Sequence, residues 1–149
     1  MRTCLYSIED LNIDLKAIVK QIKLASFSPE LVLSINRGGC IPGIYLSHYL
    51  KVPHKVINVQ LRDGDSDIDF ELQKKYLTNK KRVLIVDDIN DTGKTFEETK
   101  KIIEGDNCDF KFCALLDNIQ SSQKIDFQGK TINKSIDPLW YIFPWENWW

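Results

Sequence analysis

The chain has 149 residues, of which 43% are hydrophobic and 28% are charged, and its formal net charge at pH 7 is −1. This length can bury the core of one globular domain, so we expect a single domain over residues 1–149. The nearly neutral charge gives no electrostatic reason to expect a nucleic acid or an anionic membrane as a partner. No apolar run approaches the roughly 20 residues that span a bilayer, and the N-terminus shows no signal-peptide core. The four cysteines fit no zinc or redox spacing, so free thiols in a cytoplasmic protein are expected.

Helix and strand patterns alternate along the first half of the chain. Ser7–Asp10 predicts a capping box, and the residues that follow it at helical spacing are Leu11, Leu15, Ile18, Val19 and Ile22. Leu31–Ile35 is a short apolar run, typical of a buried parallel strand. Pro42 fits the first position of a second helix. Lys55–Leu61 predicts the next strand.

A polar segment, Arg62–Asn79, interrupts this alternation and contains four aspartates, so we expect a projecting loop that could serve as a lid. Val83–Val86 then predicts a buried strand that stops at Asp87. Thr95–Glu104 predicts a helix, with Glu97 paired to Lys101 on its outer face.

The end of the chain carries weaker signals. Gly105 is the expected C-cap of the preceding helix. Phe110–Leu116 predicts a fourth buried strand, and the pattern weakens through Ser121–Asp137. Because the carboxyl ends of parallel strands share one edge, the segments after Leu31–Ile35 and Val83–Val86 should converge on one crevice.

The segment Val83–Thr95 is the most informative of the chain. Asp87, Asp88 and Asp91 crowd the end of its apolar strand, and Thr92–Thr95 opens a helix. Unpaired N–H groups at a helix N-terminus suit a phosphate, and a glycine lets the backbone approach it closely. The acids would repel a phosphate unless they face sugar hydroxyls or a metal ion. The pattern therefore predicts a site for a ribose 5-phosphate.

A Walker-type nucleotide loop is the main competing interpretation, because Gly93-Lys94-Thr95 matches the end of that motif. The motif also requires a glycine five residues before Gly93, and Asp88 occupies that position. A carboxylate there is incompatible with the triphosphate cradle.

Three segments carry a resemblance to a known family. Val83–Thr95 resembles the phosphoribosyl pyrophosphate (PRPP) motif of the type I phosphoribosyltransferases, and Ser34–Gly43 resembles their pyrophosphate loop, with its Arg-Gly-Gly-x-x-Pro core. Trp140–Glu146 resembles the C-terminal base-site segment of the hypoxanthine, xanthine and guanine branch. The resemblance implies an α/β fold with a mostly parallel sheet flanked by helices. Its core would cover about residues 5–118, and a small hood would be formed largely by about residues 119–149.

The PRPP motif implies roles for individual residues. Asp87 and Asp88 match the acids near the ribose hydroxyls that help to organise Mg²⁺. Asp91 matches the catalytic acid beside N7 of a purine, where it manages the proton of the base. The match to the 5-phosphate cradle covers Thr92, Gly93, Lys94 and Thr95, although many relatives have a small residue where Lys94 stands.

The other two segments imply the remaining contacts. Arg37, Gly38 and Gly39 match the pyrophosphate loop, with Arg37 also carrying charge of the leaving group. The expected base-binding residues are Trp140, Tyr141, Ile142 and Asp117.

One departure leaves the base open. Relatives that use 6-oxopurines usually have a lysine after the fourth strand, where this chain has Asp117. Recognition of the oxygen at position 6 would then fall to Asn118, Lys124, the backbone or nothing. Asp117 could instead accept a hydrogen bond from an amino group.

The implied function is Mg²⁺-dependent transfer of the phosphoribosyl group of PRPP to a purine-type base such as hypoxanthine, guanine or xanthine, by a homodimer. The products would be a nucleoside 5′-monophosphate and pyrophosphate. The alternatives are a transferase for an atypical base and a non-catalytic sensor of PRPP or a nucleotide, because a fold does not fix a function.

Overall fold

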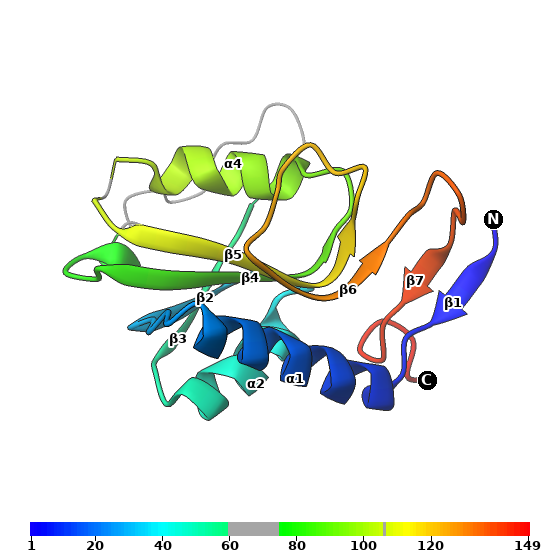
Figure 1. Ribbon diagram of the computed structural model, residues 1–149, viewed down its shortest axis with the longest axis horizontal. Coiled ribbons are helices and arrows are strands. Elements are labelled where there is room, and N and C mark those ends of the chain that lie inside the picture. Colours follow the sequence, from blue (N-terminus) through cyan, green and yellow to red (C-terminus); the bar gives the residue numbers. More distant parts are fainter. Residues whose placement is uncertain (60–74, 106) are drawn as a thin grey trace.

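A five-stranded parallel sheet forms the centre of the computed structural model, which describes residues 1–59, 75–105 and 107–149. The strand order is β3-β2-β4-β5-β6, and the bounds are β2 Leu31–Ile35, β3 His54–Ile57, β4 Arg82–Asn90, β5 Asp109–Asn118 and β6 Phe127–Ile132. Helices α1 (Ile8–Leu24) and α2 (Cys40–Leu50) cover one face of the sheet, and α4 (Lys94–Ile103) covers the other (Figure 1). The predicted α/β class is confirmed.

The central strands are apolar throughout because helices bury both of their faces. Successive side chains of a strand point to opposite faces. Val32 and Leu84 accordingly pack in the cluster that contains the apolar face of α1, whereas Leu33 and Ile85 pack with Phe96 of α4. The run Leu31–Ile35 is buried at every position, as its composition predicted.

The start of α1 follows the predicted capping box. Ser7 Oγ accepts a hydrogen bond from the backbone N–H of Asp10, and the Asp10 carboxylate accepts one from the backbone N–H of Ser7. Two of the four N–H groups that would otherwise lack partners at this end are thereby satisfied.

Three predicted details are corrected by the structure. β4 does not stop at Asp87 but continues to Asn90, because β5 runs beside it and pairs Asp87 with Ala114. α2 already begins at Cys40, so Pro42 lies inside its first turn, where a missing N–H costs no helical hydrogen bond.

The third correction concerns the outer face of α4. Lys101 pairs with Glu98 at 2.7 Å rather than with Glu97. Glu97 instead accepts a hydrogen bond from Ser122 Oγ, because its side chain faces the segment that precedes β6.

β6 was not predicted, and it extends the main sheet beyond the expected boundary at about residue 118. It is an edge strand that pairs only with β5 in the described structure, and of its six residues only Phe127 and Ile132 are buried. Partial burial of an edge strand leaves little hydrophobic pattern in the sequence.

The hood combines both ends of the chain. β1 (Thr3–Leu5) pairs in parallel with β7 (Trp140–Ile142), and the two strands lie side by side at the end of the molecule where both termini are found (Figure 1). Tyr6 contacts Phe143 with ring centroids 4.9 Å apart and donates a hydrogen bond to Asp14 of α1 at 2.6 Å. The hood is thus anchored to the main domain through its N-terminal strand.

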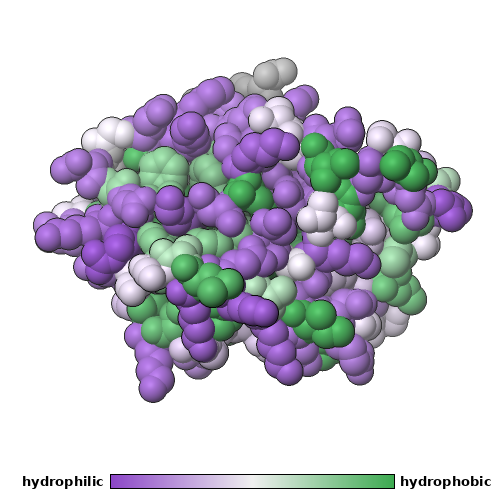
Figure 2. Space-filling view, viewed as in Figure 1, coloured by the Kyte–Doolittle hydropathy of each residue, from purple (hydrophilic) through white to green (hydrophobic). Residues whose placement is uncertain are grey.

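Hydrophobic and hydrophilic side chains alternate over the face of the molecule in Figure 2, and several hydrophobic groups gather on the side of β1 and β7. Exposed apolar residues of this part of the chain include Leu5, Ile136, Trp148 and Trp149. No helix in the described ranges is long and apolar enough to span a membrane. The expected lid, Arg62–Asn79, lies outside the described residues up to position 74, as does the end of the expected strand Lys55–Leu61 from position 60.

The capping box at the start of α1 allows a test of how this helix is stabilised. Replacing Ser7 by alanine removes the hydroxyl acceptor of the Asp10 N–H and should lower the free energy of unfolding by about 1 kcal/mol. Urea denaturation would measure this loss. Lys20→Ala, on the exposed face of the same helix, is the matched control and should change stability by less than about 0.5 kcal/mol. Equal effects of the two changes would contradict the capping role.

Candidate functional site

The acid-rich end of β4 lines a cavity of about 300 Å³ together with the turn that follows. Asp87 is buried, and its Oδ1 accepts a hydrogen bond from the backbone N–H of Asp88 at 2.9 Å. Asp87, Asp88, Asp91, Thr92, Gly93 and Thr95 all contribute to the walls of this cavity. Six of the seven positions predicted for the ribose and 5-phosphate therefore face one hollow, and Lys94 is exposed beside it.

The turn before α4 requires glycine. Gly93 has a φ of +95°, and a Cβ at this position would lie 2.6 Å from Ser122 Oγ and 2.7 Å from Ser121 Oγ. Ser122 also donates hydrogen bonds to the Thr92 carbonyl from its backbone N–H at 3.0 Å and from its Oγ at 2.9 Å. The segment before β6 thus holds the turn in place, and the N-terminus of α4, a favourable position for an anion, lies at the cavity. The Lys94 N–H donates a long hydrogen bond of 3.4 Å to Thr92 Oγ1.

The loop between β2 and α2 approaches β4 closely, as the convergence of the two motifs predicted. A Cβ on Gly38 would lie 2.2 Å from Asp88 Oδ2, and one on Gly39 would lie 2.1 Å from the Val86 carbonyl oxygen. Arg37, Gly38 and Asp88 line a second cavity of about 860 Å³, which also includes Trp145 and Glu146 of the C-terminal segment. Three regions far apart in the sequence therefore meet around the Asp88 carboxylate.

Burial and neighbouring negative charge disfavour the ionised forms of the carboxylates at this point. Burial raises the pKa of Asp87 well above its ordinary value of 3.8, and the neighbouring Asp88 adds to the effect. Burial also raises the pKa of Asp88 from 3.8 to about 6, and repulsion from Glu146 contributes. A cation in the cavity would stabilise the charged forms of these carboxylates.

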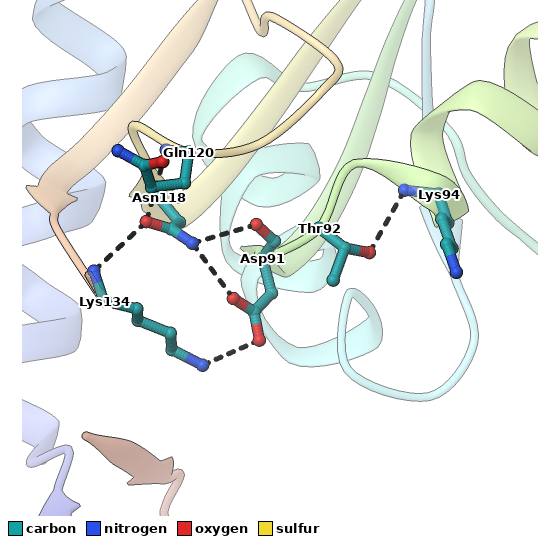
Figure 3. A network of polar contacts seen from close by, with 6 residues as sticks. All are labelled: Asp91, Thr92, Lys94, Asn118, Gln120 and Lys134. Carbon is teal, nitrogen blue, oxygen red and sulfur yellow. Dashed lines mark hydrogen bonds and ion pairs between the residues drawn. The ribbon is translucent and has the colours of Figure 1, made fainter. Parts of the chain in front are cut away.

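Asp91 belongs to a polar network that links three segments of the chain: the turn after β4, the end of β5 and the segment after β6 (Figure 3). Its Oδ2 accepts a hydrogen bond from Lys134 Nζ at 2.7 Å. Asn118, at the end of β5, donates from Nδ2 to the Asp91 carbonyl at 3.1 Å and to Oδ1 at 3.3 Å, and its own Oδ1 accepts the backbone N–H of Lys134 at 3.3 Å. Figure 3 shows the Lys94 side chain directed away from this network.

The predicted base-binding residues divide between two places. Trp140, Tyr141 and Ile142 form β7, and the Trp140 ring lies 5.8 Å from Lys134 Nζ. Asp117 belongs to a separate network, in which its Oδ1 accepts a hydrogen bond from Asn90 Nδ2 at 2.8 Å. Neighbouring residues of β5 point to opposite faces, so Asp117 and Asn118 take part in different networks.

Lys134 and Glu146 were not among the predicted site residues. Lys134 follows a poorly patterned segment and lies 43 positions from Asp91, so no local spacing indicated the contact. Glu146 was visible as the acid of the C-terminal motif, but its position opposite Asp88 depends on how the hood folds back.

The raised pKa of Asp88 predicts a specific dependence of stability on pH. Below pH 3.8 the Asp88 carboxyl is protonated in both the folded and the unfolded protein, so it does not lower the free energy of unfolding. Between 3.8 and about 6 the folded protein holds this proton more tightly than the unfolded chain, so stability falls as pH rises. Asp88→Asn removes the cost and should raise the free energy of unfolding at pH 8 by up to about 3 kcal/mol, since each pKa unit corresponds to about 1.4 kcal/mol.

Urea denaturation at pH 4 and pH 8 would measure this effect, and the gain from Asp88→Asn should be small at pH 4. Asp109→Asn, at the exposed start of β5, is the control and should have little effect at either pH. A gain that is the same at both pH values would contradict the assignment to the buried carboxylate.

Comparison with known proteins agrees with this geometry. The family model described as phosphoribosyl transferase domain matches residues 3–147. The adenine phosphoribosyltransferase of Crocosphaera subtropica is 26% identical over 137 residues, covering 83% of this chain and 80% of that protein.

Two solved structures share the fold. The purine phosphoribosyltransferase of Pyrococcus horikoshii Ot3 superposes with a TM-score of 0.76 at 24% identity, covering 99% of this chain and 95% of that one. The xanthine-guanine-hypoxanthine phosphoribosyltransferase of Helicobacter pylori gives a TM-score of 0.77 at 24% identity, covering 97% and 92%. With the family model spanning nearly its whole length, the chain belongs to the phosphoribosyl transferase domain family.

Proposed function

We propose that this protein transfers the 5-phosphoribosyl group of PRPP to a purine-type base such as hypoxanthine, guanine or xanthine, with Mg²⁺. The observation that carries the proposal is the contact between Gly38 and the Asp88 carboxylate, which joins the pyrophosphate loop to the acids at the end of β4. The names of the three relatives, all enzymes for purine bases, support the substrate class.

PRPP can be placed by matching its groups to the two cavities. The 5-phosphate fits the turn Thr92–Thr95, where Thr92, Gly93 and Thr95 line the smaller cavity at the N-terminus of α4. The ribose hydroxyls fit Asp87 and Asp88. The pyrophosphate fits the larger cavity, where Arg37 supplies positive charge.

The reaction needs no covalent nucleophile. A ring nitrogen of the base forms the new bond to C1 of the ribose as the bond from C1 to the pyrophosphate oxygen breaks, and the base loses a proton. Acids near the sugar stabilise the positive charge that develops at C1, and Arg37 stabilises the leaving charge. Asp91, which lines the smaller cavity and binds Lys134 beside Trp140, would manage the proton of the base.

The residues present fit a magnesium ion shared with the ligand. In the described parts of the chain, no group of three or more acidic, histidine or cysteine side chains is placed to hold a metal alone. Asp87 is buried and Asp88 is half-buried, both have raised pKa values, and a divalent cation would stabilise their charged forms. Mg²⁺ in such sites takes its other ligands from phosphates and water, and it would neutralise the pyrophosphate charge.

A cytoplasmic homodimer is part of the proposal. Cys4, Cys40 and Cys113 are free thiols, which suits a reducing compartment. Exposed Trp148 and Trp149 at the C-terminus offer apolar surface that a second copy could cover.

The proposed transfer predicts a large effect of Asp91→Asn. This change keeps the shape of the side chain but removes the proton acceptor, so kcat/KM should fall by about 10²- to 10⁴-fold. Purified protein would be incubated with PRPP, Mg²⁺ and a panel of bases, with monophosphate detected by mass spectrometry. Asp109→Asn, outside both cavities, should retain wild-type activity.

Two outcomes would count against the proposal. Wild-type activity of Asp91→Asn would exclude its role in proton transfer. No product from the wild-type protein with any base would exclude the transfer, and a rise of the melting temperature with PRPP would then indicate a sensor.

A further inference from the structure

Lys134 occupies a position between the acid of the sugar site and the aromatic ring of the hood. Its Nζ lies 2.7 Å from Asp91 Oδ2 and 5.8 Å from the centroid of the Trp140 ring. The Trp140 side chain is 52% exposed, so its ring has a free surface on which a base could stack. A base stacked there, with its reacting nitrogen directed to a ribose beside Asp91, would meet the Lys134 ammonium with one edge.

We propose that Lys134 is the residue that selects a 6-oxopurine, by donating a hydrogen bond to the oxygen at position 6. This inference rests on the proposed transferase function and specifies its substrate class. An ammonium has three donors and no acceptor, and one donor is engaged with Asp91. The others can pair with a carbonyl oxygen but not with the amino group of a 6-aminopurine, which presents its own hydrogens.

The structure holds this lysine in a defined position. Its backbone N–H donates to Asn118, which also binds Asp91, so both ends of the residue are tied to the same network (Figure 3). The Lys134 side chain is 20% exposed. A donor that is largely withdrawn from water penalises any ligand that leaves it unpaired, and this penalty produces discrimination between bases.

The other residues that were expected to bind the oxygen at position 6 of the base take part in other contacts. Asp117 accepts a hydrogen bond from Asn90 on the opposite side of β5 from Asn118. Burial raises the pKa of Asp117, and the nearby charge of Lys124 offsets part of the rise. Asn118 is occupied by Asp91 and Lys134. Lys134 supplies a cationic donor from a different element than the one on which the lysine of relatives was expected.

The experiment compares kcat/KM for hypoxanthine, unsubstituted purine and adenine in the wild-type protein and in Lys134→Met, Lys134→Arg and Lys124→Met. We expect Lys134→Met to lower kcat/KM for hypoxanthine by about 10- to 100-fold, as for loss of a hydrogen bond to a charged group. Purine, which lacks the oxygen, should be affected much less, and KM for PRPP should not change. Lys134→Arg should retain part of the preference for hypoxanthine over purine that Lys134→Met loses. Lys124→Met should behave as wild type.

Each other result has a definite meaning. An equal loss for hypoxanthine and purine would show that Lys134 only supports Asp91, and would overturn the inference. A wild-type preference for adenine would overturn it too, while leaving phosphoribosyl transfer established. Absence of product from the wild-type protein with every base would overturn both the inference and the proposed function.

Discussion

The close approach of the Gly38–Gly39 loop to the end of β4 is the constraint on which the site depends. With no side chains on these residues, the loop lies directly against the Asp88 carboxylate and the Val86 carbonyl oxygen. Any larger residue at Gly39 would collide with backbone atoms, which cannot move without disturbing the central strand. The contact fixes the distance between the two cavities, and in the proposed reaction the orientation of the reacting groups depends on that distance.

This arrangement carries a cost in stability. Asp87 and Asp88 are brought together at a buried strand end where both pKa values rise, and Glu146 adds a further negative charge. A protein selected only for stability would place apolar residues here, as it does at Val86 just before them. The proposed function explains these acids, because a cation and sugar hydroxyls in the cavity would offset the repulsion between the carboxylates.

The sequence was informative where one local pattern determines the structure. The apolar runs predicted β2 and the core of β4 because burial on both faces leaves no polar alternation, and the glycines predicted the two loops because nothing larger fits. Prediction failed where partners are distant. The end of β4 depends on pairing with β5, and β6 is an edge strand with two buried residues. The contact of Lys134 with Asp91 depends on how the segment after β6 returns to the sheet.

The separation of the two halves of the site has a consequence for the choice of base. The smaller cavity is built from the end of β4 and the start of α4, whereas Trp140, Lys134 and part of the wall of the larger cavity come from the segment after β6. Asn118 connects the smaller cavity to the segment after β6, because it donates hydrogen bonds to Asp91 and accepts one from the backbone N–H of Lys134. A change of side chain at position 134 would therefore act on Asp91 and on the surroundings of Trp140, while Asp87 and Asp88 are held by β4 and the Gly38 loop.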